Sequence, residues 1–562
     1  MLLSQLLGER FREKPGDAFL PSHIFMVRGG YIRQVAGGIF TLLTPARRAC
    51  QNIERIIREE MDGMGGQEVL FPVVLPGELW QESGRYEAVG SELLRFTDRG
   101  GHPMVLGMTH EEAAVQLARG EARSHAKYPF MIYQIQTKFR DEPRARGGLI
   151  RVREFTMKDA YSFHTSQEDL QAYYTRMLAC YRRIFRRVGL GEVVDIGSDS
   201  GMMGGGVAHE FMYLSEGGED TLVLCDACGY RANQEVAVRG REPWTGGERA
   251  LERVHTPGVT DIASLAVFLG IPASGTMKAA VFARAGSSLP LIAFIRGDLT
   301  VDESKLRRFA GEEVTPYTGE ELCLGYVGPL DPGEAEVVLD ESLRGAPDLV
   351  CGANERDTHL RGLSVPRDLP RARFADLARV EEGDRCPHCG APLRLSRGIE
   401  VGNIFQLGDK YTRSMGMTYV DAEGERRIPI MGCYGIGVGR LLACVAEAHH
   451  DEHGPVWPLS VAPWKVHICA LKGGEQAART LYDKLNQRYA GNVLLDDRGL
   501  TPGVQFADAD LLGAPLRIVA GSRCLAQGGL ELVARDGSFR EVVPLAALEQ
   551  RIDDCLREGA CQ

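Results

Sequence analysis

The hydrophobic pattern near the start of the chain predicts a helix followed by a strand. Apolar side chains recur at helical spacing within residues 47–62, and glycines at positions 63, 65 and 66 are expected to end this amphipathic helix. Residues 68–75 are predicted to form an apolar strand that contains Pro72. Because proline has no N–H to give to a ladder, this strand is expected at a sheet edge or bulge, where interfaces commonly form.

Residues 131–159 are predicted to form two strands joined by a loop. The period of two places the polar side chains of the first strand on one face and a more apolar set on the other, namely Gln134, Gln136, Lys138 and Arg140 against Ile135, Thr137 and Phe139. The returning strand is expected to carry Arg151, Phe155 and Asp159 on a shared face. One polar face and one buried face is typical of an antiparallel sheet.

Farther along the chain, the pattern indicates an insertion. Residues 166–188 are predicted to form a long helix that is capped by Ser166 and stopped at Gly189. From about residue 225 to 390, short helices and strands alternate among glycine- and proline-rich turns, at 261–269, 279–283, 291–296 and 303–310. This segment is predicted to be a separate α/β unit inserted into the first domain.

A strand at 427–438 and a helix at 440–449 then resume the first domain. Beyond Trp464, strands and helices alternate again, at 466–471, 477–489, 493–496 and 516–520, which indicates a compact α/β terminal domain. A chain of 562 residues is expected to hold three or four domains. We therefore predict an α+β protein with the domain limits 1–224, 225–390, 391–463 and 464–562.

Composition changes this picture little. Apolar residues make up 44% and charged residues 25%, as in an ordinary globular protein, and no run approaches the ~20 apolar residues of a membrane helix. The first residues do not resemble a secretory signal, so a cytoplasmic location without a membrane partner is expected. The net charge of −11 argues against nucleic-acid binding, although local patches can differ. Arginines cluster at 144–153 and at 182–187, and an exposed helix face explains the second cluster about as well as RNA binding does.

Two segments carry candidate phosphate-binding chemistry. Arg140 is expected on the polar face at the start of a loop, where its guanidinium can grip a phosphate bidentately. Phe155 offers a flat surface for an adenine ring, and Glu142 an acceptor for its amine, but a hairpin with surface salt bridges would contain the same residues. In the second segment, spaced glycines from Gly432 lead to Arg440 at a helix start, where the helix dipole favours anions. A structural bend would also explain these glycines.

Two tightly spaced cysteine pairs flank the insertion. Cys225 and Cys228 precede it, Cys386 and Cys389 close it, and a glycine follows each pair. Because the two ends of an inserted domain must come close together, four thiols can reach one tetrahedral zinc ion. Four reduced cysteines without a metal are the alternative. The remaining cysteines are spread along the chain, which does not favour a disulfide framework.

The two candidate phosphate-binding segments, around Arg140 and from Gly432 to Arg440, resemble in this order motifs 2 and 3 of class II aminoacyl-tRNA synthetases. The helix and strand around Pro72 resemble motif 1. The closest resemblance is to the bacterial-type prolyl-tRNA synthetase family, and it covers essentially the whole chain. It is carried by Met108-Thr-His-Glu-Glu112, Tyr133–Glu142, Lys158-Asp-Ala-Tyr-Ser-Phe163, His209-Glu-Phe211, Gly398-Ile-Glu-Val-Gly402, Asp496-Asp-Arg498 and Phe506-Ala-Asp-Ala-Asp510. One departure is Asn403, where the family often carries histidine.

The resemblance implies a fold and a reaction. It implies an antiparallel-sheet catalytic domain, an inserted editing domain and an anticodon-binding domain, with ATP and proline as substrates, Mg²⁺ on the phosphates and tRNA(Pro) as acceptor. A homodimer is expected, and DNA is not. Proline would be held by Thr109, Glu111 and His209. ATP would be held by Arg140, Glu142, Arg151, Phe155, Gln406 and Arg440, with Arg140 on the α-phosphate and Arg440 on the γ-phosphate.

The resemblance also implies correction of errors. A pocket for proline can hardly exclude the smaller alanine, and a second hydrolytic site solves this problem. Lys278 matches the functional lysine of the family's editing domain, with Asp340 and His359 as further candidates. Two other functions stay open: a synthetase-like binding module without tRNA charging, and a sister enzyme for threonine, histidine or glycine.

Overall fold

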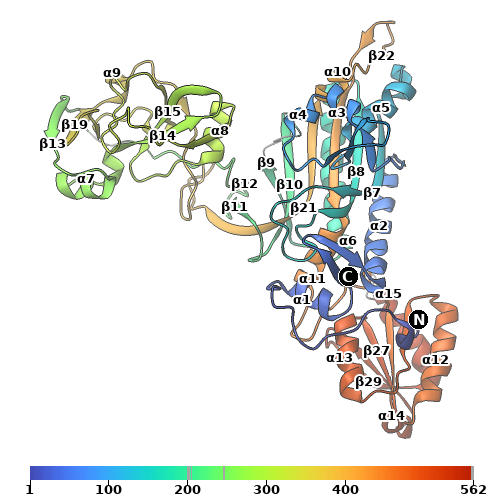
Figure 1. Ribbon diagram of the computed structural model, residues 1–562. Helices are drawn as coiled ribbons and strands as arrows, with labels where there is room; N and C mark the ends of the chain where they lie inside the picture. Colours follow the sequence, from blue (N-terminus) through green and yellow to red (C-terminus); the bar gives the residue numbers. More distant parts are fainter. Residues whose placement is uncertain (199–202, 204–205, 243, 245–246, 559–562) are drawn as a thin grey trace. The chain divides into compact units, whose positions relative to one another are not determined.

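The computed structural model describes residues 1–198, 203, 206–242, 244 and 247–558. It contains two compact units, here called the main unit (residues 1–195, 200–218 and 398–562) and the inserted unit (196–199 and 219–397). Figure 1 labels their helices and strands. Among the described residues, no helix combines the length and the apolar character that a membrane crossing requires.

An extended sheet forms the centre of the main unit. Its strands run in the order β10, β21, β24, β8, β7 and β3, antiparallel except for the parallel pair of β3 and β7. Their bounds are Gly66–Glu68 for β3, Phe130–Phe139 for β7, Glu154–His164 for β8, Val207–Leu214 for β10, Arg394–Gly408 for β21 and Ile430–Gly437 for β24. The predicted antiparallel pair at 131–159 is therefore confirmed as β7 and β8.

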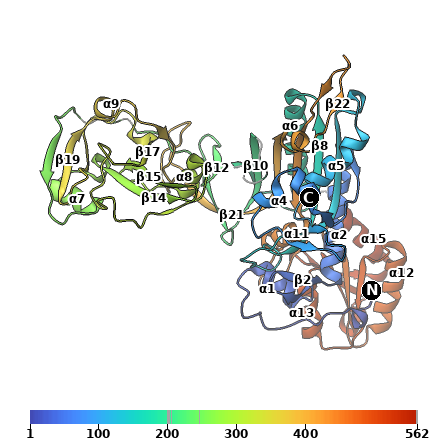
Figure 2. The ribbon, with the colours of Figure 1, turned by 45° about the horizontal axis from the view of Figure 1, so that its top comes forward.

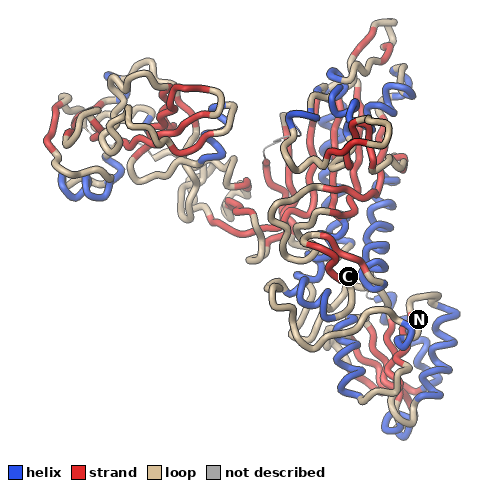
Figure 3. Tube along the Cα trace, in the orientation of Figure 1, coloured by secondary structure: helices blue, strands red, loops and turns tan. Residues whose placement is uncertain are grey.

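Long helices cover one face of this sheet (Figures 1 and 3): α2 (Thr44–Gly63), α6 (Gln167–Arg187) and α11 (Val438–Ala448). The apolar positions that predict α2 are all buried, namely Cys50, Ile53, Ile56, Ile57 and Met61. The predicted cap of α6 is also confirmed, because the Ser166 hydroxyl accepts a hydrogen bond of 3.2 Å from the Asp169 N–H. These helices leave the opposite face of the sheet for short elements and loops.

The opposite side of the main unit carries short elements around a second apolar cluster that includes Phe71, Trp80 and Val105. These are β4 (Val74–Pro76), β5 (Arg95–Thr97), β6 (Pro103–Leu106), α3 (Gly77–Glu82), α4 (Arg85–Ala88), α5 (Glu111–Glu121) and α10 (Lys410–Ser414). The remaining elements are α1 (Pro21–Arg28), β1 (Ile32–Ala36), β2 (Ile39–Leu42), β9 (Val193–Ser198), β22 (Tyr419–Val420) and β23 (Arg426–Arg427).

The predicted strand at 68–75, which Pro72 interrupts, is only partly confirmed. Only its ends are strands, in β3 and β4, because side chains of β7 bind the backbone between them. Gln134 Oε1 accepts from the Phe71 N–H at 3.0 Å, and Gln136 Nε2 donates to the Phe71 carbonyl oxygen at 3.0 Å. The segment therefore leaves the ladder, and Leu70 and Val74 remain 71% and 45% exposed.

The terminal domain is a five-stranded sheet between helices, with the order β26, β25, β27, β28 and β29. Its strands and helices are β25 (Val466–Ala470), α12 (Glu475–Arg488), β26 (Val493–Asp496), α13 (Pro502–Leu512), β27 (Leu516–Ala520), α14 (Ser522–Ala526), β28 (Gly529–Ala534), β29 (Arg540–Pro544) and α15 (Leu545–Glu558). The chain's N-terminus joins this domain, because the Met1 carbonyl oxygen accepts a hydrogen bond from the Leu495 N–H at 3.0 Å.

The inserted unit contains two sheets and a hairpin. One sheet has the order β16, β14, β15, β17 and β20, the other β13, β19 and β18. Figure 2 labels β14, β15 and β17 of the first sheet and β19 of the second. The bounds are β11 (Asp220–Leu224), β12 (Arg231–Asn233), β13 (Glu252–His255), α7 (Ile262–Leu269), β14 (Met277–Arg284), β15 (Ser287–Arg296), α8 (Glu303–Ala310), β16 (Val314–Pro316), β17 (Glu336–Asp340), β18 (Leu349–Gly352), β19 (Thr358–Leu363), α9 (Val365–Asp368) and β20 (Phe374–Ala375).

A buried histidine makes the stability of the terminal domain depend on pH. Burial lowers the pKa of His467 to about 4, and neither ring nitrogen has a hydrogen-bond partner among the described residues. In the unfolded chain, histidine takes up a proton near pH 6.5, whereas folded His467 stays neutral until about pH 4. Stability is therefore lost as the pH falls through this window.

We expect His467→Phe, which cannot titrate, to remove that loss. Between pH 6.5 and 4, the free energy of unfolding of the wild type should fall by about 3 kcal/mol more than that of the variant. Urea unfolding at a series of pH values measures this difference. Parallel pH profiles for the two proteins would contradict the assignment to His467.

Candidate active site

A pocket lies on the face of the main sheet that the long helices leave open. It is lined from β8, β21, β24, the start of α11 and the loop between β7 and β8, by Arg140, Glu142, Leu149, Ile150, Arg151, Val152, Phe155, Met157, Glu400, Val401, Gly402, Asn403, Gly435, Gly437 and Arg440. Five predicted ATP ligands are among these residues. The structure thus brings together side chains that lie some 300 positions apart in the sequence.

Arg140 connects two parts of this site. Its Nε donates to the Met108 carbonyl oxygen at 3.3 Å, and its guanidinium lies 5.4 Å from the centre of the Phe155 ring. Burial lowers the pKa of Arg140, Glu400 opposes this effect, and Arg440 adds to it. An arginine remains charged despite such a shift. The pocket therefore holds a cation whose direction is fixed by a backbone carbonyl.

Arg440 is held by backbone and carboxylate together. Its Nε donates to the Ile150 carbonyl oxygen at 2.7 Å, and one terminal nitrogen lies 3.2 Å from Glu400 Oε2. The residue stands in the first turn of α11, which begins at Val438 rather than at Arg440 as predicted. Arg440 and the free N–H groups of that turn favour the same kind of ligand, an anion.

Small residues keep the floor of the pocket open. In β24, Gly435 and Gly437 lie opposite Asp159 and Met157 of β8. A Cβ built on Gly435 would come within 2.8 Å of the Asn403 amide oxygen, closer than such contacts occur. A larger residue at 435 would therefore displace the end of the Asn403 side chain.

The second part of the site is a buried carboxylate cluster at the start of α5. Thr109 Oγ1 donates to Glu111 Oε2 at 2.6 Å, and Cys433 Sγ donates to Glu111 Oε1 at 3.3 Å. Arg85 lies 3.3 Å from Glu111 Oε2 and 3.1 Å from Glu112 Oε1. Burial raises the pKa of Glu112. Although burial lowers the pKa of Arg85, the two carboxylates raise it above its usual value.

The polar face of β7 and β8 is itself buried, which the alternation did not predict. Lys138 Nζ lies 2.8 Å from Asp159 Oδ1, and both side chains are almost fully buried. Burial raises the pKa of Asp159, but the neighbouring Lys138 and His110 lower it by more, so the net shift of this pKa is downward. Tyr161 donates to Asp159 Oδ2 at 2.6 Å and accepts from the His110 N–H at 3.0 Å. This network supports the segment that carries Thr109.

Two predicted ligands lie on the other face of the sheet. The side chain of Gln406 is bound by α6. Gln167 Nε2 donates to Gln406 Oε1 at 2.7 Å, and Gln406 Nε2 donates to Gln171 Oε1 at 2.8 Å. His209 Nδ1 lies 2.8 Å from the hydroxyl of Tyr174, also in α6. The structure does not bring these two side chains into the pocket.

No hydrogen bond or ion pair joins the three editing candidates of the inserted unit among the described residues. Lys278 on β14 is half-buried, and this burial lowers its pKa. The carboxylates of Asp298 and Glu381 partly offset the decrease. Asp340 Oδ2 accepts from the N–H groups of Leu377 and Ala378, at 2.7 and 2.9 Å. His359 Nδ1 lies 2.6 Å from Thr256 Oγ1.

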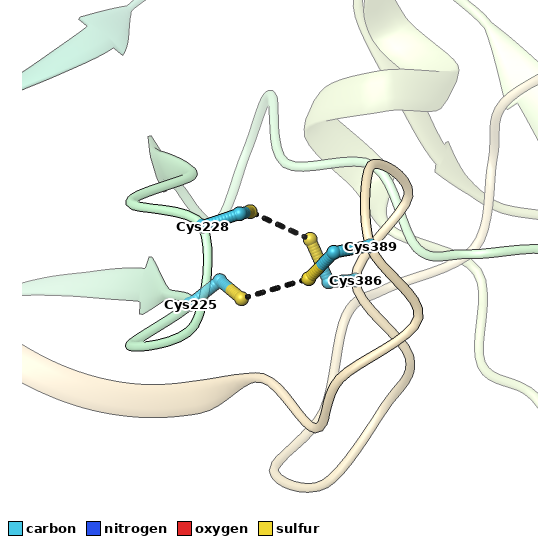
Figure 4. Close-up of side chains that lie close together, drawn as sticks. All are labelled: Cys225, Cys228, Cys386 and Cys389. Carbon is cyan, nitrogen blue, oxygen red and sulfur yellow. Dashed lines mark hydrogen bonds between the residues drawn. The ribbon is translucent and has the colours of Figure 1, made fainter.

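The structure also brings the four cysteines of the two pairs together, with all four sulfur atoms within 4.8 Å of one another (Figure 4). Cys225 and Cys386 are buried, whereas Cys228 and Cys389 are exposed. Four thiolates at such distances suit a tetrahedral metal ion.

Two residues of the site escaped the sequence reasoning. Glu400 belongs to the motif Gly398–Gly402, but sequence reasoning assigned it no role. Its ion pair with Arg440 places it in the pocket. Arg85 carried no signal at all, because it follows a helical segment of ordinary composition and lies far in sequence from its partners. The adjacent acidic residues Glu111 and Glu112, which precede an apolar helix face, could have indicated a nearby cation, because buried carboxylates are usually paired.

The family model described as the class II core domain of tRNA synthetases (G, H, P, S and T) matches residues 94–449, and that of an anticodon binding domain matches residues 465–554. These matches define the class, the class II aminoacyl-tRNA synthetases.

The relatives narrow this class. The proline–tRNA ligases of Salinispora tropica and Trichlorobacter lovleyi are each 43% identical to this chain, over 98% and 99% of its length and 96% and 98% of their own. The chain therefore belongs to the proline–tRNA ligase family, which confirms the resemblance. A solved prolyl-tRNA synthetase from Cryptosporidium parvum, complexed with L-proline and AMP, shares the fold with a TM-score of 0.57 at 14% identity, covering 99% of this chain and 78% of that one.

We expect Arg85→Met to destabilise the main unit by about 3–5 kcal/mol, because it leaves two buried carboxylates without their cation. Urea unfolding of the variant measures this loss. A second change, Glu112→Gln in the same chain, should restore part of it by removing one of the unpaired charges. If Arg85→Met unfolds at the denaturant concentration of the wild type, the cluster does not support the fold in this way.

Proposed function

We propose that this chain activates proline with ATP to form prolyl-adenylate, and then transfers the prolyl group to the 3′ end of tRNA(Pro). The observation that carries the proposal is the convergence of Arg140, Phe155, Glu400 and Arg440 on one pocket. A pocket with an aromatic ring and two fixed guanidinium groups suits a purine nucleotide and its phosphates.

In the first step, a carboxylate oxygen of proline attacks the α-phosphorus of ATP, and pyrophosphate leaves with the electrons of the broken P–O bond. Arg140 is proposed to bind the α-phosphate and Arg440 the γ-phosphate. Because both side chains are already oriented by backbone carbonyls, they stabilise the developing charge without reorganising. The chain contributes positioning and charge, and no covalent intermediate with the protein is required.

Adenine is proposed to stack on Phe155, with Glu142 beside it. Glu142 Oε1 lies 2.9 Å from an Arg151 nitrogen, so the two side chains hold each other at the pocket wall. Mg²⁺ is expected on the ATP phosphates, and the Glu400 carboxylate supplies an oxygen donor of the kind this ion prefers. Such an ion would neutralise phosphate charge. Glu400 also lies 3.2 Å from Arg440 and offsets the effect of burial on the pKa of Arg140.

Proline is proposed to bind where Arg140 meets the Thr109 segment. The carboxylate of Glu111 and the hydroxyl of Thr109 are suitable partners for a secondary ammonium group. Arg85, Cys433 and Thr109 fix both oxygens of Glu111, so its carboxylate cannot turn away. In the second step, a terminal hydroxyl of the tRNA attacks the adenylate carbonyl and AMP leaves.

The terminal domain is proposed to bind the anticodon. A cleft opens at the carboxyl ends of the parallel strands β25 and β27, the usual place for ligands in such sheets. It is lined by Phe506, Lys472, Arg523 and Arg540 among others. An aromatic ring and basic side chains are suited to unpaired bases and their phosphates.

A homodimer is proposed on the edge that contains Pro72. Leu70 and Val74 are exposed on either side of this proline, although both are apolar. An apolar edge of this kind suits a twofold interface with a second copy of the chain.

The inserted unit is proposed to hydrolyse alanyl-tRNA(Pro) made in error, with Lys278 at its site. Lys278 is the candidate whose charged group is least engaged by the backbone, whereas the carboxylate of Asp340 binds three N–H groups and organises the junction of β17 and β20. An ammonium group beside Asp298 and Glu381 could hold the ester carbonyl or the terminal nucleotide.

Amino-acid-dependent exchange between ATP and pyrophosphate tests the proposed reaction. Proline should support it best in a panel of amino acids, and Arg140→Ala should reduce it at least about 100-fold, because a fixed donor to the reacting phosphate is lost. Arg144→Ala, an exposed arginine in the same loop, is the matched control and should retain activity. Exchange driven best by another amino acid, or by none, would overturn the proposal.

Release of alanine from alanyl-tRNA(Pro) tests the editing proposal separately. Lys278→Ala should lose most of this activity while proline-dependent exchange stays at the wild-type level. Arg307→Ala, an exposed substitution in the same unit, should affect neither activity. Equal alanine release by the wild type and Lys278→Ala would reject the role of Lys278.

A further inference from the structure

The base of the inserted unit is built from two copies of one local structure. The segments Cys225-Asp-Ala-Cys-Gly-Tyr230 and Cys386-Pro-His-Cys-Gly-Ala391 place cysteine and glycine at equivalent positions. In each, the glycine has a positive φ, +77° at Gly229 and +75° at Gly390. The backbone of each segment therefore turns in the same way directly after the second cysteine.

The backbone hydrogen bonds of the two turns also correspond. The glycine N–H donates to the carbonyl oxygen of the first cysteine, at 2.9 Å from Gly229 and 3.0 Å from Gly390. The N–H of the first cysteine donates to the carbonyl oxygen of the residue after the glycine, at 2.8 Å from Cys225 to Tyr230 and 2.7 Å from Cys386 to Ala391. Two segments with different side chains thus share one fold, which points to a shared requirement at the cysteines.

Backbone N–H groups are directed at the sulfur atoms in both turns. The Ala227 N–H bonds to Cys225 Sγ, and the equivalent His388 N–H bonds to Cys386 Sγ at 3.4 Å. The N–H groups of Tyr230 and Ala391 bond to the second sulfur of each turn. Backbone N–H donors are thus placed at all four sulfur atoms, and a thiolate accepts such hydrogen bonds more strongly than a thiol does.

The sulfur positions match a tetrahedral metal centre. Across the two turns, Cys225 Sγ lies 3.5 Å from Cys389 Sγ, and Cys228 Sγ lies 3.5 Å from Cys386 Sγ (Figure 4). A tetrahedral centre with Zn–S bonds of about 2.3 Å has sulfur–sulfur edges of about 3.8 Å. A disulfide would require about 2.05 Å. The cluster is therefore too open for disulfides and nearly the right size for zinc.

Neighbouring side chains hold the two turns against each other. The rings of Tyr230 and His388 lie 5.0 Å apart, so this histidine packs on the opposite turn. Arg394 Nε lies 3.3 Å from Asp226 Oδ2. Beneath the sulfurs, Val223, Ala232, Val380 and Leu393 form a small apolar cluster with Cys225 and Cys386. An apolar shell of this kind shields a metal centre from water.

From this geometry we propose that the four cysteines bind one structural zinc ion, which ties the two ends of the inserted unit together. The ion would cross-link positions that are 158 and 164 residues apart. Closing a long loop removes conformational freedom from the unfolded chain. The inserted unit would then depend on zinc for its stability, and the active-site pocket would not.

Metal analysis of protein purified without added zinc and under reducing conditions tests the site. About one zinc ion per chain is expected. The variant Cys225→Ser/Cys386→Ser, with one change in each turn, should lose the metal. Cys323→Ser, which changes a partly buried cysteine outside the cluster, is the matched control and should keep it.

Cobalt supplies a measurement that does not rely on a folded variant. Wild-type protein refolded with Co²⁺ should show the intense visible bands and the sulfur-to-metal charge transfer of a tetrahedral tetrathiolate. Removing the zinc should make the inserted unit sensitive to protease, while proline-dependent exchange persists. Free thiols without metal, two disulfides, or iron in place of zinc would each overturn the proposal.

Discussion

The buried ion pair between Lys138 and Asp159 is the interaction on which the substrate-facing side of the main sheet depends. Two charges removed from water are tolerated only when each has a partner and further hydrogen bonds. Here, Asp159 also binds Gln134 and Tyr161, at 2.9 and 2.6 Å. Gln134 draws residues 69–73 out of the ladder, and Tyr161 supports the segment of Thr109. One buried pair thereby contacts both the edge that contains Pro72 and the Thr109 segment, where proline is proposed to bind.

The part of the pocket proposed to bind phosphate also pairs buried charges, but here two cations share one carboxylate. Arg140 and Arg440 would repel each other in an otherwise empty pocket, and the Glu400 carboxylate offsets that repulsion. The Met108 carbonyl oxygen accepts a hydrogen bond from Nε of Arg140, and the Ile150 carbonyl oxygen accepts one from Nε of Arg440. Nη1 of Arg440 is also held, since it lies 3.2 Å from Glu400 Oε2. The site is thus organised before any phosphate arrives, so that little reorganisation remains when charge develops.

The sequence could predict the elements better than their exposure. Helical periodicity located α2 and α6, and alternating or short apolar runs located β7, β8, β14, β15 and the terminal domain, because these signals lie in each element's own residues. These signals failed at 68–75, where the side chains of Gln134 and Gln136 on another strand decide the backbone's path. The alternation of β7 showed which residues share a face but not that this face is buried. His209 and Gln406 carry suitable groups, yet strand register turns them toward α6, and register is not visible in one strand's sequence. Arg85 was invisible because only the fold brings it to Glu111 and Glu112.

The two units solve the problem of a stable core differently. The main unit buries a continuous apolar cluster between its sheet and α2, α6 and α11. The inserted unit has several smaller clusters, and the one at its base includes two of the four cysteines. Small cores seldom stabilise a fold by themselves and are commonly supplemented by a metal or a cross-link. At the base of the insertion the first and last strands must be held in register although more than 150 residues separate them. Four thiolates that arrive from both ends of the segment place that supplement where the loop closes, which is the position at which one cross-link restricts the largest part of the unfolded chain.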